Sequence, residues 1–241
     1  MHSNLPPIAN DVLAALPRAE YQRLFPHLER VTLVEGQLLC DAGRPMQHVY
    51  FPCDSLVSLL TLVDGNEVFA VSLVGREGMT SVATALGSKV SPFRVRVQGT
   101  GGALRMKATL FVKQFRDSAA IRRVVLSYVL SLTVQIAQTA ACNHFHSIEA
   151  RLARWLLMTR DRLSSDQFYI THEMLGHLLG VRRVSVTNAA HDIKMRGLID
   201  YSRGAIIILD GQALQRTACS CYQASDIRPG ATKVTPPSWL L

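Results

Sequence analysis

The segment from residue 182 to residue 188 carries side chains that can bind the edges of nucleotide bases. An arginine can donate two hydrogen bonds to the O6 and N7 atoms of guanine, and an asparagine can pair in the same way with adenine. The candidates in this segment are Arg182, Arg183, Val184, Ser185 and Asn188. Such residues read bases only when a rigid element carries them into a groove of DNA. The surrounding sequence must therefore supply that element.

Two short helices joined by a tight turn are predicted around this segment. Thr171 is a good N-cap for a first helix, and Gly180 suits the left-handed turn that would end it. Gly176 is small enough for a second helix to cross closely. That second helix is predicted from about Arg182 to Arg196, with Gly197 ending it. This order of features is typical of a helix-turn-helix.

A β-hairpin is predicted directly after the second helix. Two strand-like pieces flank Ser202-Arg203-Gly204 within residues 198–210, which places Arg203 near the tip of a wing. Arg203 and the capping residue Thr171 are better placed for phosphates than for bases. The whole unit predicts a winged helix-turn-helix whose partner is double-stranded DNA.

The charge of the chain agrees with an anionic partner. The 241 residues carry a net charge of +8, and the nine Lys/Arg and single acid between Lys89 and Arg123 account for the whole excess. Hydrophobic residues make up 48% of the chain, which is enough to build folded cores. Five scattered cysteines indicate reduced thiols, so we expect a cytoplasmic protein without a disulfide framework.

The N-terminal part changes from helix to strand. Residues 10–27 have helical spacing interrupted by Pro17, and residues 28–110 alternate short apolar runs with turn residues. Asp64-Gly65 predicts a hairpin between two of these runs. In residues 93–97, the apolar side chains should face one way and the two arginines, Arg94 and Arg96, the other. This alternation of short apolar runs and turns predicts a small antiparallel β-roll. Together with the helices it predicts an α+β fold.

Helical patterning returns after residue 110. One apolar stripe of residues 111–145 comprises Val125, Tyr128, Val129, Leu132 and Ile136. Such a helix fits a dimer interface, although it could instead pack inside its own domain. Residues 124–148 contain no charged side chain, but Gln135 and Gln138 argue against a membrane span. Residues 147–163 predict a further amphipathic helix whose arginines 151, 154 and 162 lie away from its apolar face.

Together these features resemble the Crp/Fnr family of bacterial transcription regulators. The resemblance covers the glycine-punctuated roll, the long helix and the turn from Leu179 to Arg183 with its wing. It implies a cyclic-nucleotide-binding-like roll that serves as sensor (1–110), a dimerisation helix (111–146) and a winged helix-turn-helix (147–225), and we expect residues 226–241 to form a flexible tail. It also implies a homodimer on a pseudo-palindromic operator and RNA polymerase as a further partner.

The resemblance does not extend to the residues that distinguish well-known members. Their DNA readers carry Arg-Glu and a further Arg at the places occupied here by Arg183-Val184 and Asn188, so only Arg183 matches. Members that bind cyclic AMP have Gly-Glu and Arg-Ser or Arg-Thr in a short segment of the roll. Here Glu77 is shifted and Arg94 precedes valine, so we do not expect cyclic AMP.

An anionic small-molecule effector in the roll remains one prediction. Its candidate residues are Gly75, Glu77, Gly78, Arg94 and Arg96. The alternative is that the basic excess is only a solvated strand face and a charged helix start.

Neither a metal site nor an enzyme active site is expected. Cys142, His144 and His146 are ligand-type residues, but alternate positions on a helix diverge by about 200°. Packing and capping roles are therefore favoured, and Cys219 and Cys221 are expected to be structural or incidental. No nucleophile–base arrangement or phosphate-binding Walker loop is present in the sequence. Apart from DNA binding, an effector module whose helix-turn-helix contacts protein stays open as an alternative.

Overall fold

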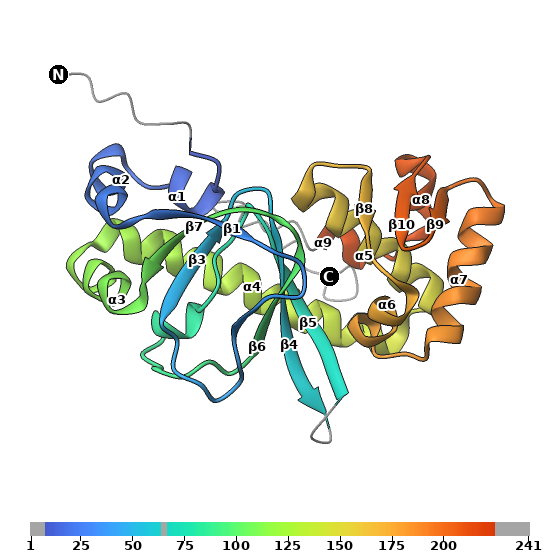
Figure 1. Ribbon diagram of the computed structural model, residues 1–241, viewed down its shortest axis with the longest axis horizontal. Helices are drawn as coiled ribbons and strands as arrows, with labels where there is room; N and C mark the ends of the chain where they lie inside the picture. Colours follow the sequence, from blue (N-terminus) through green and yellow to red (C-terminus); the bar gives the residue numbers. More distant parts are fainter. Residues whose placement is uncertain (1–7, 64–66, 225–241) are drawn as a thin grey trace, which may run out of the picture.

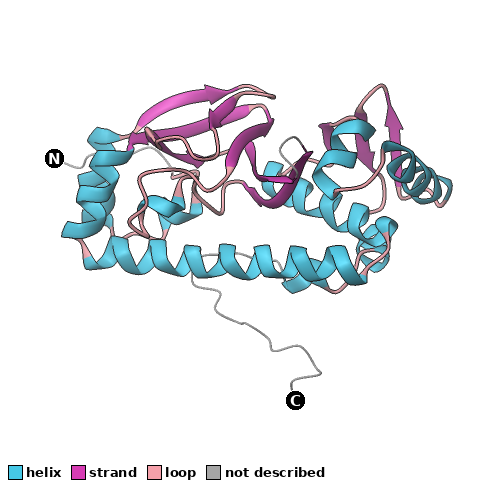
Figure 2. Cartoon of the chain, turned by 90° about the horizontal axis from the view of Figure 1, so that it is seen from below, coloured by secondary structure: helices cyan, strands magenta, loops and turns pink. Residues whose placement is uncertain are grey.

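The computed structural model describes residues 8–63 and 67–224, and in them a β-roll and a helical domain lie along one long helix, α4 (Figures 1 and 2). The predicted N-terminal helix is divided at Pro17, as its sequence indicates. The elements before the roll are α1 (Asp11–Ala14), α2 (Arg18–Leu24) and the 3-10 helix η1 (Phe25–His27).

Two antiparallel sheets form the roll. One has the strand order β1-β7-β3 and the other β2-β6-β4-β5. Their apolar faces enclose a core that includes Val49, Phe51, Val57, Val74 and Val97. The strands are β1 (Glu29–Leu33), β2 (Leu38–Cys40), β3 (His48–Pro52), β4 (Leu56–Val63), β5 (Glu67–Val74), β6 (Arg94–Gly99) and β7 (Gly101–Lys107), with the 3-10 helix η2 (Val82–Thr84) between β5 and β6.

The alternation predicted for β6 is confirmed. Val95 and Val97 are buried in the core, whereas Arg94 is half-buried and Arg96 is exposed. The hairpin predicted at Asp64-Gly65 joins β4 and β5, which pair antiparallel, but the turn itself lies outside the described residues.

The helix expected over 111–146 is in fact two helices. α3 (Ala108–Asp117) ends before Ser118, whose backbone is extended, and α4 (Ala119–Phe145) begins directly after it. The Ser118 hydroxyl accepts a hydrogen bond from the backbone N–H of Ile121, which caps α4. Serine favours this N-cap geometry over the interior of a helix, so the break follows from the side chain at position 118.

The apolar stripe predicted on α4 packs inside its own chain. Val125, Tyr128 and Leu132 are buried in the core of the roll. The opposite face is exposed and has heptad spacing; it consists of Arg123, Leu126, Leu130, Thr133, Ala137, Ala140 and His144, which we call the α4 seam. By length and composition α4 could also cross a membrane, but core helices of soluble proteins pass the same test.

The following helix, α5 (Ile148–Leu163), is buried on nearly every side. The sequence places Arg151, Arg154 and Arg162 away from the apolar face of this helix, yet each is at most 8% exposed, so that side of α5 is buried as well. The reason is that α5 is covered by the roll on one side and by the helix-turn-helix on the other. Side chains from both parts form one core, including Leu56, Leu73, Leu156, Leu178 and Val186.

Candidate nucleic-acid interface

The first helix of the predicted helix-turn-helix is α6 (His172–Leu179). Thr171 caps it, because the threonine hydroxyl accepts a hydrogen bond of 3.1 Å from the backbone N–H of Met174. Gly180 ends it in the left-handed conformation, with φ of +63°. Both boundaries are those expected from the sequence.

Gly176 brings α6 against the start of the second helix, α7 (Arg183–Met195). A Cβ atom at this position would lie 2.9 Å from the carbonyl oxygen of Val181 and 3.4 Å from the backbone nitrogen of Arg183. Because both neighbours are backbone atoms, they cannot move aside as a side chain could. The glycine therefore fixes the angle at which α7 leaves the turn.

One face of α7 is buried and the opposite face is open. Val186, Ala189, Ala190 and Ile193 pack into the core. Most of the predicted base-reading residues lie on the open side: Arg182, Arg183, Val184 and Asn188 are exposed, and Ser185 is half-buried. The helix begins one residue after the predicted start, with Arg182 as its N-cap.

The predicted wing is a three-stranded sheet with the order β8-β10-β9. Its strands are β8 (Gln167–Tyr169), β9 (Ile199–Ser202) and β10 (Ala205–Ile208). The two residues between β9 and β10, Arg203 and Gly204, both have positive φ angles, of 48° and 90°. This is the backbone geometry of a tight two-residue hairpin, and it leaves the Arg203 side chain exposed at the tip.

A concave surface joins the helices to the wing. A depression of about 290 Å³ is lined by Thr171, His172 and Arg183 together with Tyr201, Arg203 and Gly204. Three sequence-predicted residues from three different elements therefore meet here. Arg182, Arg183 and Arg203 form no ion pair with any described residue, whereas Lys194 and Arg196 at the far end of α7 pair with Asp200 and Glu149.

His172 lines the same depression, although it is not among the DNA-contacting residues predicted from the sequence. Its Nδ1 atom lies 3.1 Å from the hydroxyl of Thr187, and its ring makes an edge contact with Tyr201. Burial lowers the pKa of His172, and the positive charge of Arg183 lowers it further. Both effects favour the neutral form of the imidazole, which bridges α6, α7 and the wing.

Side chains from two helices of the same chain fill the space beside the glycine and glutamate residues that were predicted to bind an effector. A Cβ at Gly75 would lie 2.6 Å from the Cβ of Arg162, and one at Gly78 would overlap the ring of Tyr128. The Glu77 carboxylate accepts hydrogen bonds from the backbone N–H of Gly75 at 3.1 Å and from Arg162 Nε at 2.9 Å. Both side chains of this ion pair are at most 10% exposed.

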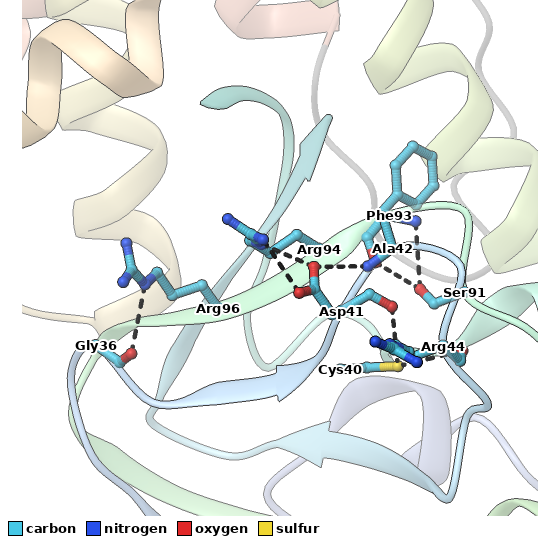
Figure 3. A network of polar contacts seen from close by, with 9 residues as sticks. All are labelled: Gly36, Cys40, Asp41, Ala42, Arg44, Ser91, Phe93, Arg94 and Arg96. Carbon is cyan, nitrogen blue, oxygen red and sulfur yellow. Dashed lines mark hydrogen bonds and ion pairs between the residues drawn. The ribbon is translucent and has the colours of Figure 1, made fainter. Parts of the chain in front are cut away.

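The two arginines proposed for an effector have other partners (Figure 3). Arg94 donates two hydrogen bonds, of 2.8 and 3.1 Å, to the carboxylate of Asp41. These bonds hold the pKa of Asp41 below its usual value. Arg96 donates to the carbonyl oxygen of Gly36 at 3.4 Å. Glu77 and Arg94 thus have separate partners within the chain, and the sequence did not predict either Asp41 or Arg162 in these roles.

Known proteins share both the C-terminal domain and the whole fold. Residues 150–217 match the Crp-like helix-turn-helix domain. A transcriptional regulator of the Crp/Fnr family from Eubacterium rectale has a similar structure, with a TM-score of 0.67 and 17% identity over 87% of this chain and 98% of that one. No match is found among curated protein sequences.

Two further solved structures have nearly the same similarity. FixK2 from Bradyrhizobium japonicum gives a TM-score of 0.67 at 12% identity, over 80% of this chain and 98% of that one. The c-di-GMP responsive global regulator CLP of Xanthomonas campestris gives 0.66 at 13% identity, over 80% and 99%. The resemblance predicted from the sequence is thereby confirmed: the chain carries a Crp-like helix-turn-helix domain within the fold of the Crp/Fnr transcriptional regulators.

Proposed function

We propose that this protein is a transcription regulator that reads DNA with the exposed start of α7. The observation that carries this proposal is the depression where Arg183, Thr171 and Arg203 meet without an internal anionic partner among the described residues. An arginine without a counter-ion at a helix start is available to a guanine edge, and one at a wing tip to a phosphate. The matched helix-turn-helix domain and the solved Crp/Fnr regulators support the same function.

Val184 distinguishes the readout of this protein. Its side chain lies on the open face of α7 and is 66% exposed. An apolar side chain at this position can contact the methyl group of thymine. We therefore propose an operator half-site in which a guanine read by Arg183 lies beside a thymine.

Arg183→Ala is expected to weaken operator binding by about 1–3 kcal/mol, or roughly 5- to 150-fold, because a bidentate contact to one base is lost. The loss should be much smaller on random DNA, where only phosphate contacts remain. Binding to both duplexes is measured by fluorescence anisotropy at one fixed salt concentration. Arg116→Ala, at an exposed arginine of α3, is the matched control and should bind as the unmodified protein does. An equal loss on both duplexes would contradict a base-reading role for Arg183.

We also propose that the protein acts on its operator as a homodimer formed through the α4 seam. The seam repeats every three and four residues with Leu126, Leu130, Thr133 and Ala137, which is the spacing of a two-helix packing face. Leu126 and Leu130 are 44% and 50% exposed in the single chain, and the alanines would allow close approach of the partner helix. Figure 2 shows α4 along one side of the molecule, where a second copy can reach it.

Leu130→Glu is expected to weaken this dimer by about 2–4 kcal/mol, or roughly 30- to 900-fold in dissociation constant, because the two-fold axis brings a buried charge from each chain together. Sedimentation equilibrium over a concentration series measures the shift. Leu86→Glu, at a leucine of the roll that is 65% exposed, is the control and should leave the dimer unchanged. A Leu130→Glu protein that remains dimeric at the same concentrations would show that the chains meet elsewhere.

An anionic effector in the roll would have to compete with the ion pairs that its candidate residues already form within the chain. Such a ligand would have to displace Asp41 from Arg94, or Arg162 from Glu77, before it could use those side chains. We therefore propose that any effector exchanges with these ion pairs instead of entering a preformed cyclic AMP site.

A further inference from the structure

Four ligand-type side chains converge where α4 ends. Cys142 lies in the last turn of α4 and His146 is the C-cap of that helix. Cys219 lies between α8 (Gly211–Thr217) and α9 (Cys221–Ala224), and Cys221 is the first residue of α9. The sulfur atoms and an imidazole nitrogen of these four residues all lie within 4.8 Å of one another. Cys142 and Cys219 are 3.4 Å apart at their Sγ atoms, and Cys221 Sγ is 3.5 Å from His146 Nδ1.

Local structure explains why two pairs of ligands face each other. Cys142 and His146 are four residues apart, so they lie on the same face of α4, unlike the alternate positions considered from the sequence. The C-terminal segment is also held against α5 by an independent contact, since the Tyr222 hydroxyl donates a 2.6 Å hydrogen bond to Asp161 of that helix. The convergence therefore does not depend on the cysteines themselves.

The distances suit one tetrahedral metal ion. Zinc bonds of about 2.3 Å to sulfur and about 2.0 Å to nitrogen place two ligand sulfurs about 3.8 Å apart, and a sulfur and a nitrogen about 3.5 Å apart. The observed separations of 3.4 and 3.5 Å are close to these values. An iron–sulfur cluster would spread its four ligands over at least two irons, and a disulfide would leave the third thiol and the imidazole unused.

The surroundings suit thiolate ligands. Gln138 Nε2 donates a hydrogen bond of 2.8 Å to Cys221 Sγ, which is the kind of contact that orients and stabilises a ligating sulfur. Arg151 and Arg154 are buried on the adjacent face of α5, and each interacts electrostatically with Cys142. Three thiolates around a divalent ion carry a net charge of −1, which these guanidinium groups offset. Cys142 and Cys221 are 1% and 2% exposed, whereas Cys219 and His146 are half-buried and leave a path for entry.

We propose that Cys142, His146, Cys219 and Cys221 form a Cys3His zinc site. His146 is the C-cap of α4 and directly precedes Ser147, the N-cap of α5, so the site lies at the joint between the two helices. A bound ion ties that joint to the C-terminal helices of the helix-turn-helix domain. The site thereby fixes the orientation of the DNA-reading domain relative to α4.

Metal titration of the full chain tests this proposal. Protein purified under reducing conditions and freed of metal is titrated with Co²⁺, whose absorption spectrum reports tetrahedral thiolate ligation. We expect saturation at one Co²⁺ per chain, with thiolate-to-cobalt charge transfer and intense visible bands, followed by displacement by one equivalent of Zn²⁺. The melting temperature should rise on Zn²⁺ addition, because an ion that binds only the folded state stabilises it.

Matched variants separate this site from adventitious binding. Cys221→Ser and Cys219→Ser should weaken Co²⁺ binding at least about 100-fold, since loss of a direct ligand exceeds the 10- to 100-fold cost of losing its supporting partner. His146→Ala should change the visible bands, whereas His144→Ala, two residues away on the exposed seam, should not. Cys53→Ser, in the roll, should bind as the unmodified protein does. Circular dichroism establishes that each variant is folded.

Three outcomes would overturn the proposal. The first is folded, reduced protein that gives no tetrahedral Co²⁺ spectrum. The second is an unchanged spectrum in folded Cys221→Ser. The third is a Cys142–Cys219 disulfide that forms even when Zn²⁺ is present in excess, because a ligated thiolate pair should resist oxidation.

Discussion

Replacing Arg162 with methionine is expected to lower the free energy of unfolding by about 3–5 kcal/mol, because it leaves the Glu77 carboxylate buried without its cationic partner. Arg162 and Glu77 meet at 2.9 Å with side chains only 7% and 10% exposed. Arg162 also donates a hydrogen bond of 3.1 Å to the carbonyl oxygen of Met158. When the Gln135 amide is oriented with its nitrogen toward Ser72, its oxygen accepts a further hydrogen bond of 2.7 Å from Arg162. Methionine keeps the apolar stem of the side chain, so the loss reports the guanidinium.

The ion pair between Arg105 and Glu29 provides the control. Its geometry is equally good, at 2.8 Å, but its side chains are 33% and 61% exposed. Water can solvate Glu29 after Arg105→Met, so that variant should lose no more than about 1 kcal/mol. Urea denaturation followed by circular dichroism measures both changes. The double variant Glu77→Gln/Arg162→Met should recover part of the loss, because no uncompensated charge remains. An Arg162→Met loss no larger than that of Arg105→Met would show that the pair does not join the roll to α5 energetically.

Gly176→Ala is expected to destabilise the protein by about 1–3 kcal/mol and to weaken operator binding. Helix propensity alone predicts the opposite sign, since alanine is favoured over glycine by about 1 kcal/mol inside a helix. Steric contact should prevail here, because the new Cβ would lie 2.9 Å from the carbonyl oxygen of Val181. Relieving that contact requires a backbone shift, which moves the start of α7 and with it Arg183.

His177→Ala is the control on the same helix. His177 is exposed, so removing its ring creates no contact with the backbone of the turn, and stability should change by less than about 0.5 kcal/mol. Urea denaturation gives the stability of both variants, and fluorescence anisotropy gives their operator binding at a temperature where both are folded. A stabilised Gly176→Ala protein with unchanged operator binding would show that the turn tolerates a Cβ and that Gly176 does not set the crossing of α6 and α7.

The helix-turn-helix could be predicted from the sequence because its boundaries are marked by local signals. Thr171 caps α6, Gly180 ends it in a left-handed conformation, and Gly197 follows α7 with a φ of +71°. Each of these roles depends only on the residue type and on the few residues next to it in the chain. Strand alternation placed Arg94 and Arg96 on the outer side of β6 in the same way. Ser118 was a comparable local signal for the break between α3 and α4, which the sequence prediction did not use.

What escaped prediction depends on contacts between distant segments. Arg162 meets Glu77 across 85 residues, and the amphipathic pattern of α5 gave no indication that its arginines would be covered by the roll. Cys142 meets Cys219 across 77 residues, so no spacing rule could join the two pairs. The apolar stripe of α4 was recognised correctly as needing cover, but the roll of the same chain provides that cover and the exposed seam is a different face.

We propose above that two copies of this chain read a two-fold symmetric DNA site with α7. Selection of bound sequences from a random pool of duplexes tests it most directly. We predict enrichment of an inverted repeat whose half-site centres lie about one helical turn, or about 10 base pairs, apart. Each half-site should contain a guanine whose preference is lost in Arg183→Ala. Failure to enrich any sequence, or enrichment of a single site without two-fold symmetry that Arg183→Ala binds equally well, would show that the protein does not read DNA in this way.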